Sequence, residues 1–359
     1  MVLSSLGAPR VGLLPAGALD AITDVPGVAL GHCTLDDGAT QTGVTVLLPQ
    51  PGDLFLHKLP AGLAVINGFG KSVGLMQVQE LGTLESPIAL VSTLAVGTAA
   101  TALVRDALAH NPEIARSLPT LNPLVFECND GWLNDARVLA LQESHVAQAL
   151  AAAREAQRQG QGNFAQGSFG AGRGMSCHGL KGGIGSASRR VAWQGQEFNV
   201  GALVLANQGR PEALTIAGRR IGEALQARLQ AEAGPERGSI IVLLATDAPL
   251  DARQLGRVAR RAAAGLARTG SDYGHGSGDI ALAFSTAWRV PQLADEPMPA
   301  VAMLHEAALD GVFQAAAEAT EQAIVHALFA ATTVTGRDGR TRHALTGLAP
   351  DWQALMANS

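Results

Sequence analysis

Short apolar stretches separated by turn residues dominate the first hundred residues of the chain. Residues 43–49, 61–68 and 86–93 each hold a run of mostly aliphatic side chains, bounded by glycine, proline or polar residues. Runs of this length and composition are typical of strands that are buried in a sheet. The N-terminal part of the chain is therefore predicted to be rich in strands.

Helical periodicity appears further along the chain. Apolar residues recur at a spacing of three or four in four segments, which are predicted to be helices: 139–159, 211–233, 255–266 and 305–331. The first three segments are followed by residues that commonly end a helix, which are Gly160, Gly234 with Pro235, and Gly270. Two more strands are expected at 198–209 and 278–288. Strands followed by long helices in both halves predict an α+β protein of stacked layers.

A glycine-dense stretch at residues 167–189 separates the first helix from the strand 198–209. Its length predicts a loop with a function. It holds no GxxxxGKS/T sequence, and its GAGRGM segment departs from GxGxxG at the last position, so no nucleotide site is expected. The nine histidines form no HExxH motif. We therefore expect neither a cofactor nor a metal.

The charge and the cysteine content indicate which kinds of partner and which cellular compartment to expect. Charged residues make up 16% of the chain, the net charge is −5, and basic residues are scattered, which excludes an electrostatic footprint for nucleic acid or an anionic membrane. The three cysteines are far apart and form no CxxC pair. No apolar run approaches the roughly 20 residues of a membrane helix. A cytoplasmic protein with a small neutral or cationic partner is expected.

Ser239 lies behind Gly238 at the start of a strand that is apolar on both faces, after a short polar loop at 236–238. One interpretation is that its hydroxyl only forms hydrogen bonds with polar groups of the loop. The other is that Ser239 attacks the carbonyl of Gly238, which has no side chain to block the approach. Cleavage would free the α-amine of Ser239, with an ordinary pKa of about 7.7–8.0, as a general base. Spacing alone leaves both open.

Ser277 and Asp279 are two residues apart at the head of another predicted strand. Their side chains are expected on the same face, about 7 Å apart along the strand. Ala281 and Ala283 continue that face and leave room beside the pair. A hydroxyl and a carboxylate placed in this way can orient a nucleophile and an ammonium group. The alternative is that Asp279 caps a turn after Gly278.

Two other places offer polar groups for a site. Asn207, where a strand opens into a loop, carries an amide that can complete an oxyanion hole. Carboxylates gather in an otherwise lightly charged chain at Glu127, Asp130 and Asp135, a suitable seat for a cationic amine. An ordinary solvated turn around Asp130 explains the second group equally well.

Taken together, these residues resemble the self-processing serine aminopeptidases of the DmpA and β-peptidyl aminopeptidase family. The matching blocks are 22–32, 42–49, 61–75, 170–189, 203–209, 238–250 and 277–287. The resemblance implies an N-terminal-nucleophile hydrolase with a four-layer α/β/β/α sandwich. It implies a single catalytic domain, 1–359, that cuts itself into 1–238 and 239–359, and it implies a homo-oligomer.

The resemblance also implies roles for individual residues. The family's nucleophile corresponds to Ser239, its supporting serine and acid to Ser277 and Asp279, and its oxyanion asparagine to Asn207. The acid that holds the substrate amine corresponds to Glu127.

The chain departs from the family pattern at two positions. Asn129 stands where characterised members carry an active-site tyrosine, and a short amide neither reaches nor shapes a pocket as a phenol does. Trp132 is the candidate to fill part of that space. Asp279 stands where some relatives carry glutamate. The aspartate side chain is shorter by about one methylene group, so its carboxylate reaches less far.

The leading hypothesis is an aminopeptidase that releases an N-terminal residue from short peptides, amides or esters through an acyl-enzyme on Ser239. One alternative is an acyltransferase related to the ornithine acetyltransferases, in which the corresponding nucleophile is threonine. The other is an uncleaved, glycine-rich binding protein without enzymatic activity.

Overall fold

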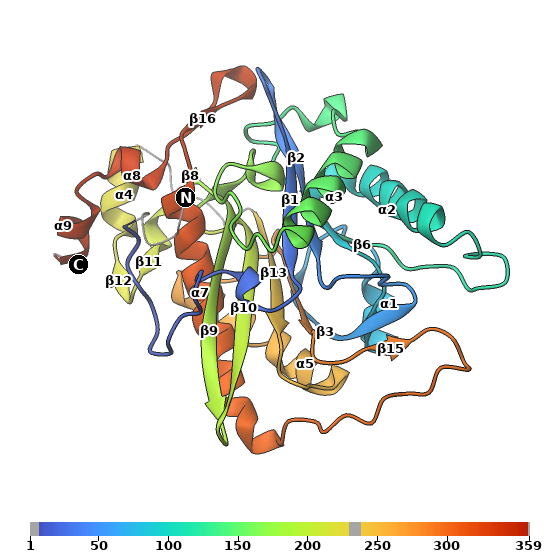
Figure 1. Ribbon diagram of the computed structural model, residues 1–359. Helices are drawn as coiled ribbons and strands as arrows, with labels where there is room; N and C mark the ends of the chain where they lie inside the picture. The colour runs from blue at the N-terminus through green and yellow to red at the C-terminus, as the bar shows by residue number, and fades with distance from the viewer. Residues whose placement is uncertain (1–6, 230–237, 358–359) are drawn as a thin grey trace.

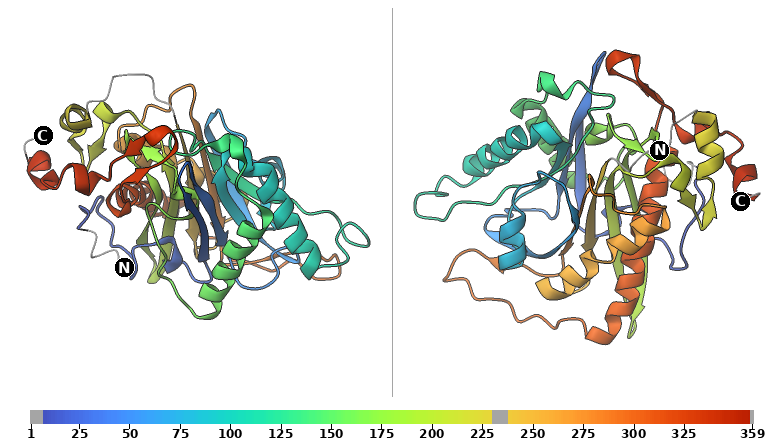
Figure 2. Two further views of the ribbon diagram at one scale, coloured as in Figure 1. Left: turned by 90° about the horizontal axis from the view of Figure 1, so that it is seen from above. Right: turned by 180° about the vertical axis from the view of Figure 1, so that it is seen from behind.

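Two β-sheets stacked face to face form the centre of the molecule, and helices cover the outer face of each (Figures 1 and 2). The structure is a computed structural model that describes residues 7–229 and 238–357. The four-stranded sheet has the order β1-β2-β5-β6, with β1 at Ala29–Asp37, β2 at Thr40–Leu48, β5 at Ile88–Ser92 and β6 at Leu124–Cys128.

The seven-stranded sheet has the order β15-β3-β14-β13-β10-β9, and the short β4 also pairs with β3. Its strands are β3 (His57–Gly68), β4 (Thr83–Leu84), β9 (Gly183–Trp193), β10 (Gln196–Asn207), β13 (Ser239–Thr246), β14 (Gly278–Ser285) and β15 (Val290–Pro291). The central strands β13 and β14 are parallel to each other and antiparallel to their outer neighbours β10 and β3. Because of this pairing, β13 has a partner on each side.

Helices close the sandwich on both outer faces. Against the four-stranded sheet lie α2 (Val96–His110) and α3 (Glu143–Arg158). Against the seven-stranded sheet lie α5 (Ala252–Ala259), α6 (Ala262–Arg268) and α7 (Leu309–Ala330). The shorter helices are α1 (Leu75–Leu81), α4 (Gly222–Leu229), α8 (Leu345–Leu348) and α9 (Trp352–Ala357). In the described ranges, no helix combines the length and the apolar character needed to cross a bilayer.

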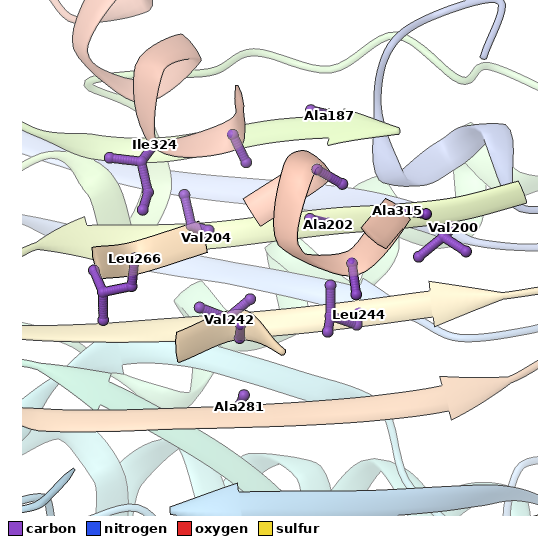
Figure 3. Close-up of a cluster of buried hydrophobic side chains, with 14 of the residues drawn as sticks. Ala187, Val200, Ala202, Val204, Val242, Leu244, Leu266, Ala281, Ala315 and Ile324 are labelled. Atoms are coloured by element: carbon purple, nitrogen blue, oxygen red, sulfur yellow. The ribbon is translucent and has the colours of Figure 1, made fainter. Parts of the chain in front are cut away.

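Alternate residues of β13 pack into two different cores. Val242 and Leu244 point toward the helical layer of α6 and α7, beside Ala281 of β14 (Figure 3). Ile241 and Leu243 belong instead to the core between the two sheets. A third core separates the four-stranded sheet from α2 and α3. The prediction that β13 is apolar on both faces because it is central is therefore confirmed.

The four-layer α/β/β/α prediction agrees with these layers, and most of the predicted elements are present. The strands expected at 43–49, 61–68 and 86–93 are β2, β3 and β5. Those expected at 198–209 and 278–288 are β10 and β14, and the helices at 139–159 and 305–331 are α3 and α7. The helix predicted at 255–266 is interrupted by a turn and forms α5 and α6.

The helix predicted over 211–233 is wrong in its first half. The chain instead forms a small hairpin of β11 (Thr215–Ile216) and β12 (Arg219–Arg220), and only then α4. Ala217 and Gly218 have φ of 50° and 76°, the left-handed conformation of a tight turn, which a helix cannot contain. The predicted end of this helix and the loop up to residue 237 lie outside the described residues.

The prediction of a single loop for 167–189 is also wrong. After a short hairpin of β7 (Ser176–Cys177) and β8 (Leu180–Lys181), the chain enters the long strand β9 at Gly183. Helix α7 lies directly on this strand, and a methyl group on Gly185 would come within 1.9 Å of the carbonyl oxygen of Ala323. Gly185 permits close packing of the helix on the sheet. The high glycine content of 167–189 therefore does not indicate a loop over the whole stretch.

Candidate active site

The ends of four neighbouring strands meet at one edge of the seven-stranded sheet. Asn207 ends β10, Ser239 begins β13, Gly278 begins β14, and Gly68 ends β3. The register aligns them in a row, because Asn207 pairs with Ser239, Ser239 with Gly278, and Gly278 with Gly68. Residues from three distant parts of the sequence therefore meet around Ser239.

Ser239 and Gly238 occupy the centre of this row. The Ser239 side chain is almost completely buried, and its Oγ accepts a hydrogen bond of 3.2 Å from the backbone N–H of Gly278. A methyl group on Gly238 would lie 1.9 Å from the carbonyl oxygen of Asn207. The backbone before Ser239 therefore lies against β10 so closely that only glycine fits.

Ser277 and Asp279 are both fully buried and contact each other. The Ser277 hydroxyl donates a hydrogen bond of 2.6 Å to Asp279 Oδ1, which also accepts the backbone N–H of Ile240 at 3.3 Å. Asp279 thus reaches across to β13 at the residue that follows Ser239. Ala281 and Ala283 continue its face of the strand, as the alternation predicts. The carboxylate contacts the backbone beside Ser239 through Ile240.

The amide of Asn207 is fixed by two hydrogen bonds. Its Oδ1 accepts the backbone N–H of Ser176 at 2.8 Å, and its Nδ2 donates to the carbonyl oxygen of Asn129 at 3.0 Å. A side-chain amide nitrogen carries two N–H groups, so a second donor remains beside Ser239. Asn207 also ties the end of β10 to the segment that follows β6.

Glu127 is the carboxylate that reaches the cavity beside Ser239. It is 2% exposed, and its Oε1 accepts the backbone N–H of Lys71 at 2.8 Å, while its Oε2 accepts the hydroxyl of Thr93. The other two acids of this segment serve the local structure. Asp130 accepts hydrogen bonds from Thr42, Ser92 and Asn134, and Asp135 caps a short 3-10 turn.

A cavity of about 740 Å³ joins these groups, and its wall includes Phe69, Glu127, Asn129, Trp132, Asn207 and Ser239. The exposed side chain of Asn129 bonds its own turn through the N–H of Gly131 at 2.9 Å. Trp132 is 46% exposed, and the guanidinium groups of Arg340 and Arg342 lie over its ring. Six of the predicted site residues line this cavity: Glu127, Asn129, Trp132, Asn207, Gly238 and Ser239. Ser277 and Asp279 are not in the described lining, and they approach Ser239 through the backbone of Ile240.

Other residues of the wall were not predicted. Lys71 and Thr93 hold Glu127, Ser176 holds Asn207, and Arg337 and Arg342 line the cavity from the C-terminal part of the chain. One signal was available in the sequence, since residues 337–343 hold three arginines and a histidine in a chain that is only 16% charged. Nothing in that segment indicates its contact with Trp132.

Two stacked sheets between helical layers, with a serine at the first residue of a central strand, define an N-terminal-nucleophile hydrolase. The model of peptidase family S58 matches residues 20–342, and the chain belongs to this family. The β-peptidyl aminopeptidase BapA of Sphingosinicella xenopeptidilytica is 39% identical over 352 residues, which cover 92% of this chain and 85% of that protein.

Solved structures agree with this assignment. A β-aminopeptidase from a Burkholderia species superposes with a TM-score of 0.88 at 41% identity, covering 99% of this chain and 98% of that one. The L-aminopeptidase D-Ala-esterase/amidase of Ochrobactrum anthropi gives a TM-score of 0.86 at 34% identity, covering 98% and 99%. The latter is described as a prototype of the serine aminopeptidases and a variant of the N-terminal-nucleophile hydrolase fold. The predicted family and fold class are confirmed.

Proposed function

We propose that this protein is an aminopeptidase that removes the N-terminal residue from short peptides, amides and esters, after cutting its own chain between Gly238 and Ser239. The observation that carries the proposal is the meeting of Ser239, Asn207 and Glu127 around one cavity. They would supply a nucleophile, an oxyanion donor and a seat for an ammonium group. Membership of a peptidase family favours this activity over the binding-protein alternative.

Self-cleavage would come first. The Ser239 hydroxyl attacks the carbonyl carbon of Gly238, the peptide bond becomes an ester, and the α-nitrogen of Ser239 takes up the proton as it leaves. Water then hydrolyses the ester. The close approach of Gly238 to the backbone of Asn207 supports this step, because the same residue carries the side-chain amide that is the potential oxyanion donor.

Gly238→Ala is expected to slow the appearance of the two fragments by at least about tenfold, because a misplaced reacting group loses much of its rate. The added methyl group would meet the carbonyl oxygen of Asn207 and push residue 238 out of place. Gel electrophoresis of freshly expressed protein over time measures this rate. Gly97→Ala is the control, since a methyl group there meets nothing within 4 Å. Equal rates for both variants and the wild type would contradict the steric argument.

Turnover of substrate would use the same hydroxyl with a new base. The freed α-amine of Ser239 accepts the hydroxyl proton, Oγ attacks the substrate carbonyl, and the second N–H of Asn207 stabilises the oxyanion. The departing amine takes the proton, and water then opens the acyl-enzyme. Ser277 and Asp279 are positioning residues that orient the start of β13. Because relatives are named as β-peptidyl aminopeptidases, substrates with an N-terminal β-amino residue should be tested beside substrates with an N-terminal α-amino residue.

Acetylation of the substrate amine is expected to reduce kcat/KM by about tenfold or more, because the buried Glu127 would lose a charge-assisted hydrogen bond and keep only the neutral donors of Lys71 N–H and Thr93. The measurement compares an aminoacyl arylamide with its N-acetyl form. Glu127→Gln should reduce the difference between the two, since the amide keeps the shape and removes the charge. Equal rates for the free and the acetylated substrate in the wild type would remove Glu127 from the substrate site.

Supplying ornithine as an acyl acceptor separates hydrolysis from acyl transfer. We expect free acid as the product, with no acylated ornithine. The homo-oligomeric assembly and the cytoplasmic location stay predictions of the sequence.

A further inference from the structure

The cavity has an acidic end on one side of Ser239. Glu127 bonds the backbone of Lys71, which follows β3. A methyl group on the neighbouring Gly70 would lie 3.6 Å from Glu127 Oε1 and 3.8 Å from the Cα of Gly278. The carboxylate therefore lies toward β14 and β3, on one side of β13 in the sheet order.

The opposite end is basic and is tied to β10. Arg342 Nε donates to Ser176 Oγ at 3.1 Å, and Ser176 N–H in turn donates to Asn207 Oδ1 at 2.8 Å. Since Asn207 pairs with Ser239 from the β10 side, Arg342 lies beyond the nucleophile as seen from Glu127. The described lining holds two other cations: Arg337, from the same segment as Arg342, and Lys71, which is exposed and lies over the ring of Phe69 on the acidic side.

The guanidinium of Arg342 is oriented by its neighbours and can bind an anion. It stacks on Trp132 with 4.2 Å to the ring centre, and no carboxylate of the described residues lies within ion-pair distance of it. Its neighbours Arg337 and Arg340 instead share Asp338, at 3.3 Å and 3.5 Å. Burial lowers the pKa of Arg342 to about 10, so the group keeps its charge at neutral pH.

We propose that Arg342 binds a carboxylate carried by the leaving group of the substrate, so that the preferred substrates are short peptides with a free C-terminus. This inference rests on the proposed function. With the ammonium group at Glu127 and the scissile carbonyl at Ser239, the leaving group extends toward β10 and Arg342. Arginine presents paired N–H donors that match a carboxylate, and stacking on Trp132 fixes its plane. A residue spans at most about 3.6 Å, so a C-terminus within two residues of the scissile bond lies within about 7 Å of it.

The test measures the ratio of kcat/KM for a peptide to that for the same peptide amidated at its C-terminus. Dipeptides and tripeptides with an unmodified N-terminus are used, together with an amidated dipeptide whose second residue is aspartate. For the wild type we expect a ratio of about ten or more with one of the two lengths, the scale of one charge-assisted hydrogen-bonded pair. Arg342→Gln should bring that ratio close to one, and Arg342→Lys should retain part of it.

Arg340→Gln is the matched control. Arg340 stacks on the same tryptophan, with 4.9 Å to the ring centre, but does not line the cavity, so its variant should keep the wild-type ratio. In a second outcome, the wild type cleaves the amidated dipeptide that ends in aspartate faster than a neutral dipeptide amide, and Arg342→Gln does not. That result would still support a carboxylate site at Arg342, occupied by the side chain of the substrate's second residue. Ratios near one and no gain from aspartate in the wild type would overturn the inference while the aminopeptidase activity stands. No turnover of any substrate with a free amine would overturn the proposed function, and this inference with it.

Discussion

The Ser239→Ala protein is expected to remain one chain of 36.9 kDa and to release no product from any aminopeptidase substrate. Without the hydroxyl, neither the attack on Gly238 nor the attack on a substrate carbonyl has a nucleophile. The wild type should instead separate on a denaturing gel into residues 1–238 and 239–359, about two thirds and one third of the mass. Intact mass spectrometry locates the cut, and an aminoacyl arylamide reports the turnover.

Two further variants make this prediction specific. Ser285→Ala removes another fully buried hydroxyl, at the far end of β14, where it donates to the carbonyl oxygen of Ala248, and should still be cut. Ser239→Cys should be cut slowly, because a thiol is also a nucleophile. Cleavage that persists in Ser239→Ala, or full activity of a wild-type chain shown by mass to be uncut, would overturn the mechanism.

The two fragments should stay together under native conditions. Strand β13 would begin the smaller fragment, yet it pairs along its whole length with β10 of the larger one. Each of its residues is buried, and its two faces contribute to two cores that also contain side chains of the larger fragment. Apolar burial on this scale holds separate chains in one fold.

Local patterns were sufficient to predict the two central strands β13 and β14, but they left the role of Ser239 open. The continuous apolar run after Ser239 is typical of a strand buried on both faces, and the alternation after Asp279 predicts one face of small residues. Both features depend only on neighbours in sequence. The family resemblance then connected Ser239, Asn207 and Glu127, which are far apart along the chain and close in the fold.

Contacts that depend on tertiary packing were not predictable in this way. The glycine at 185 indicates a loop in sequence, but it lies where α7 packs onto β9. Arg342 looks like any surface arginine until the fold brings it against Trp132 and Ser176. No periodicity encodes such a contact, because its partners come from three separate segments of the chain. The arginine end of the cavity therefore emerged only from the structure.

Asp279→Asn is expected to fold and to lower the turnover number by about 10²-fold or more, the scale of the acid–base catalysis by the Ser239 α-amine that Asp279 would orient. The asparagine oxygen can still accept the hydroxyl of Ser277 and the N–H of Ile240, so the local structure should persist. What disappears is a negative charge one peptide unit away from the nitrogen that self-cleavage would release. Circular dichroism checks the fold, and the turnover number is measured on protein whose cleavage has been verified by mass.

The pH profile separates an electrostatic role from a structural one. A nearby carboxylate favours the charged form of an ammonium group and raises its pKa, so removing that charge lowers the pKa of the Ser239 α-amine. The amine then becomes a base at lower pH, and the rising limb of kcat/KM should move toward acid in Asp279→Asn. Asp247→Asn is the control, because Asp247 follows the far end of β13 and accepts hydrogen bonds from Asn199 there. Wild-type turnover with an unmoved limb in a folded Asp279→Asn protein would reduce Asp279 to a structural acceptor.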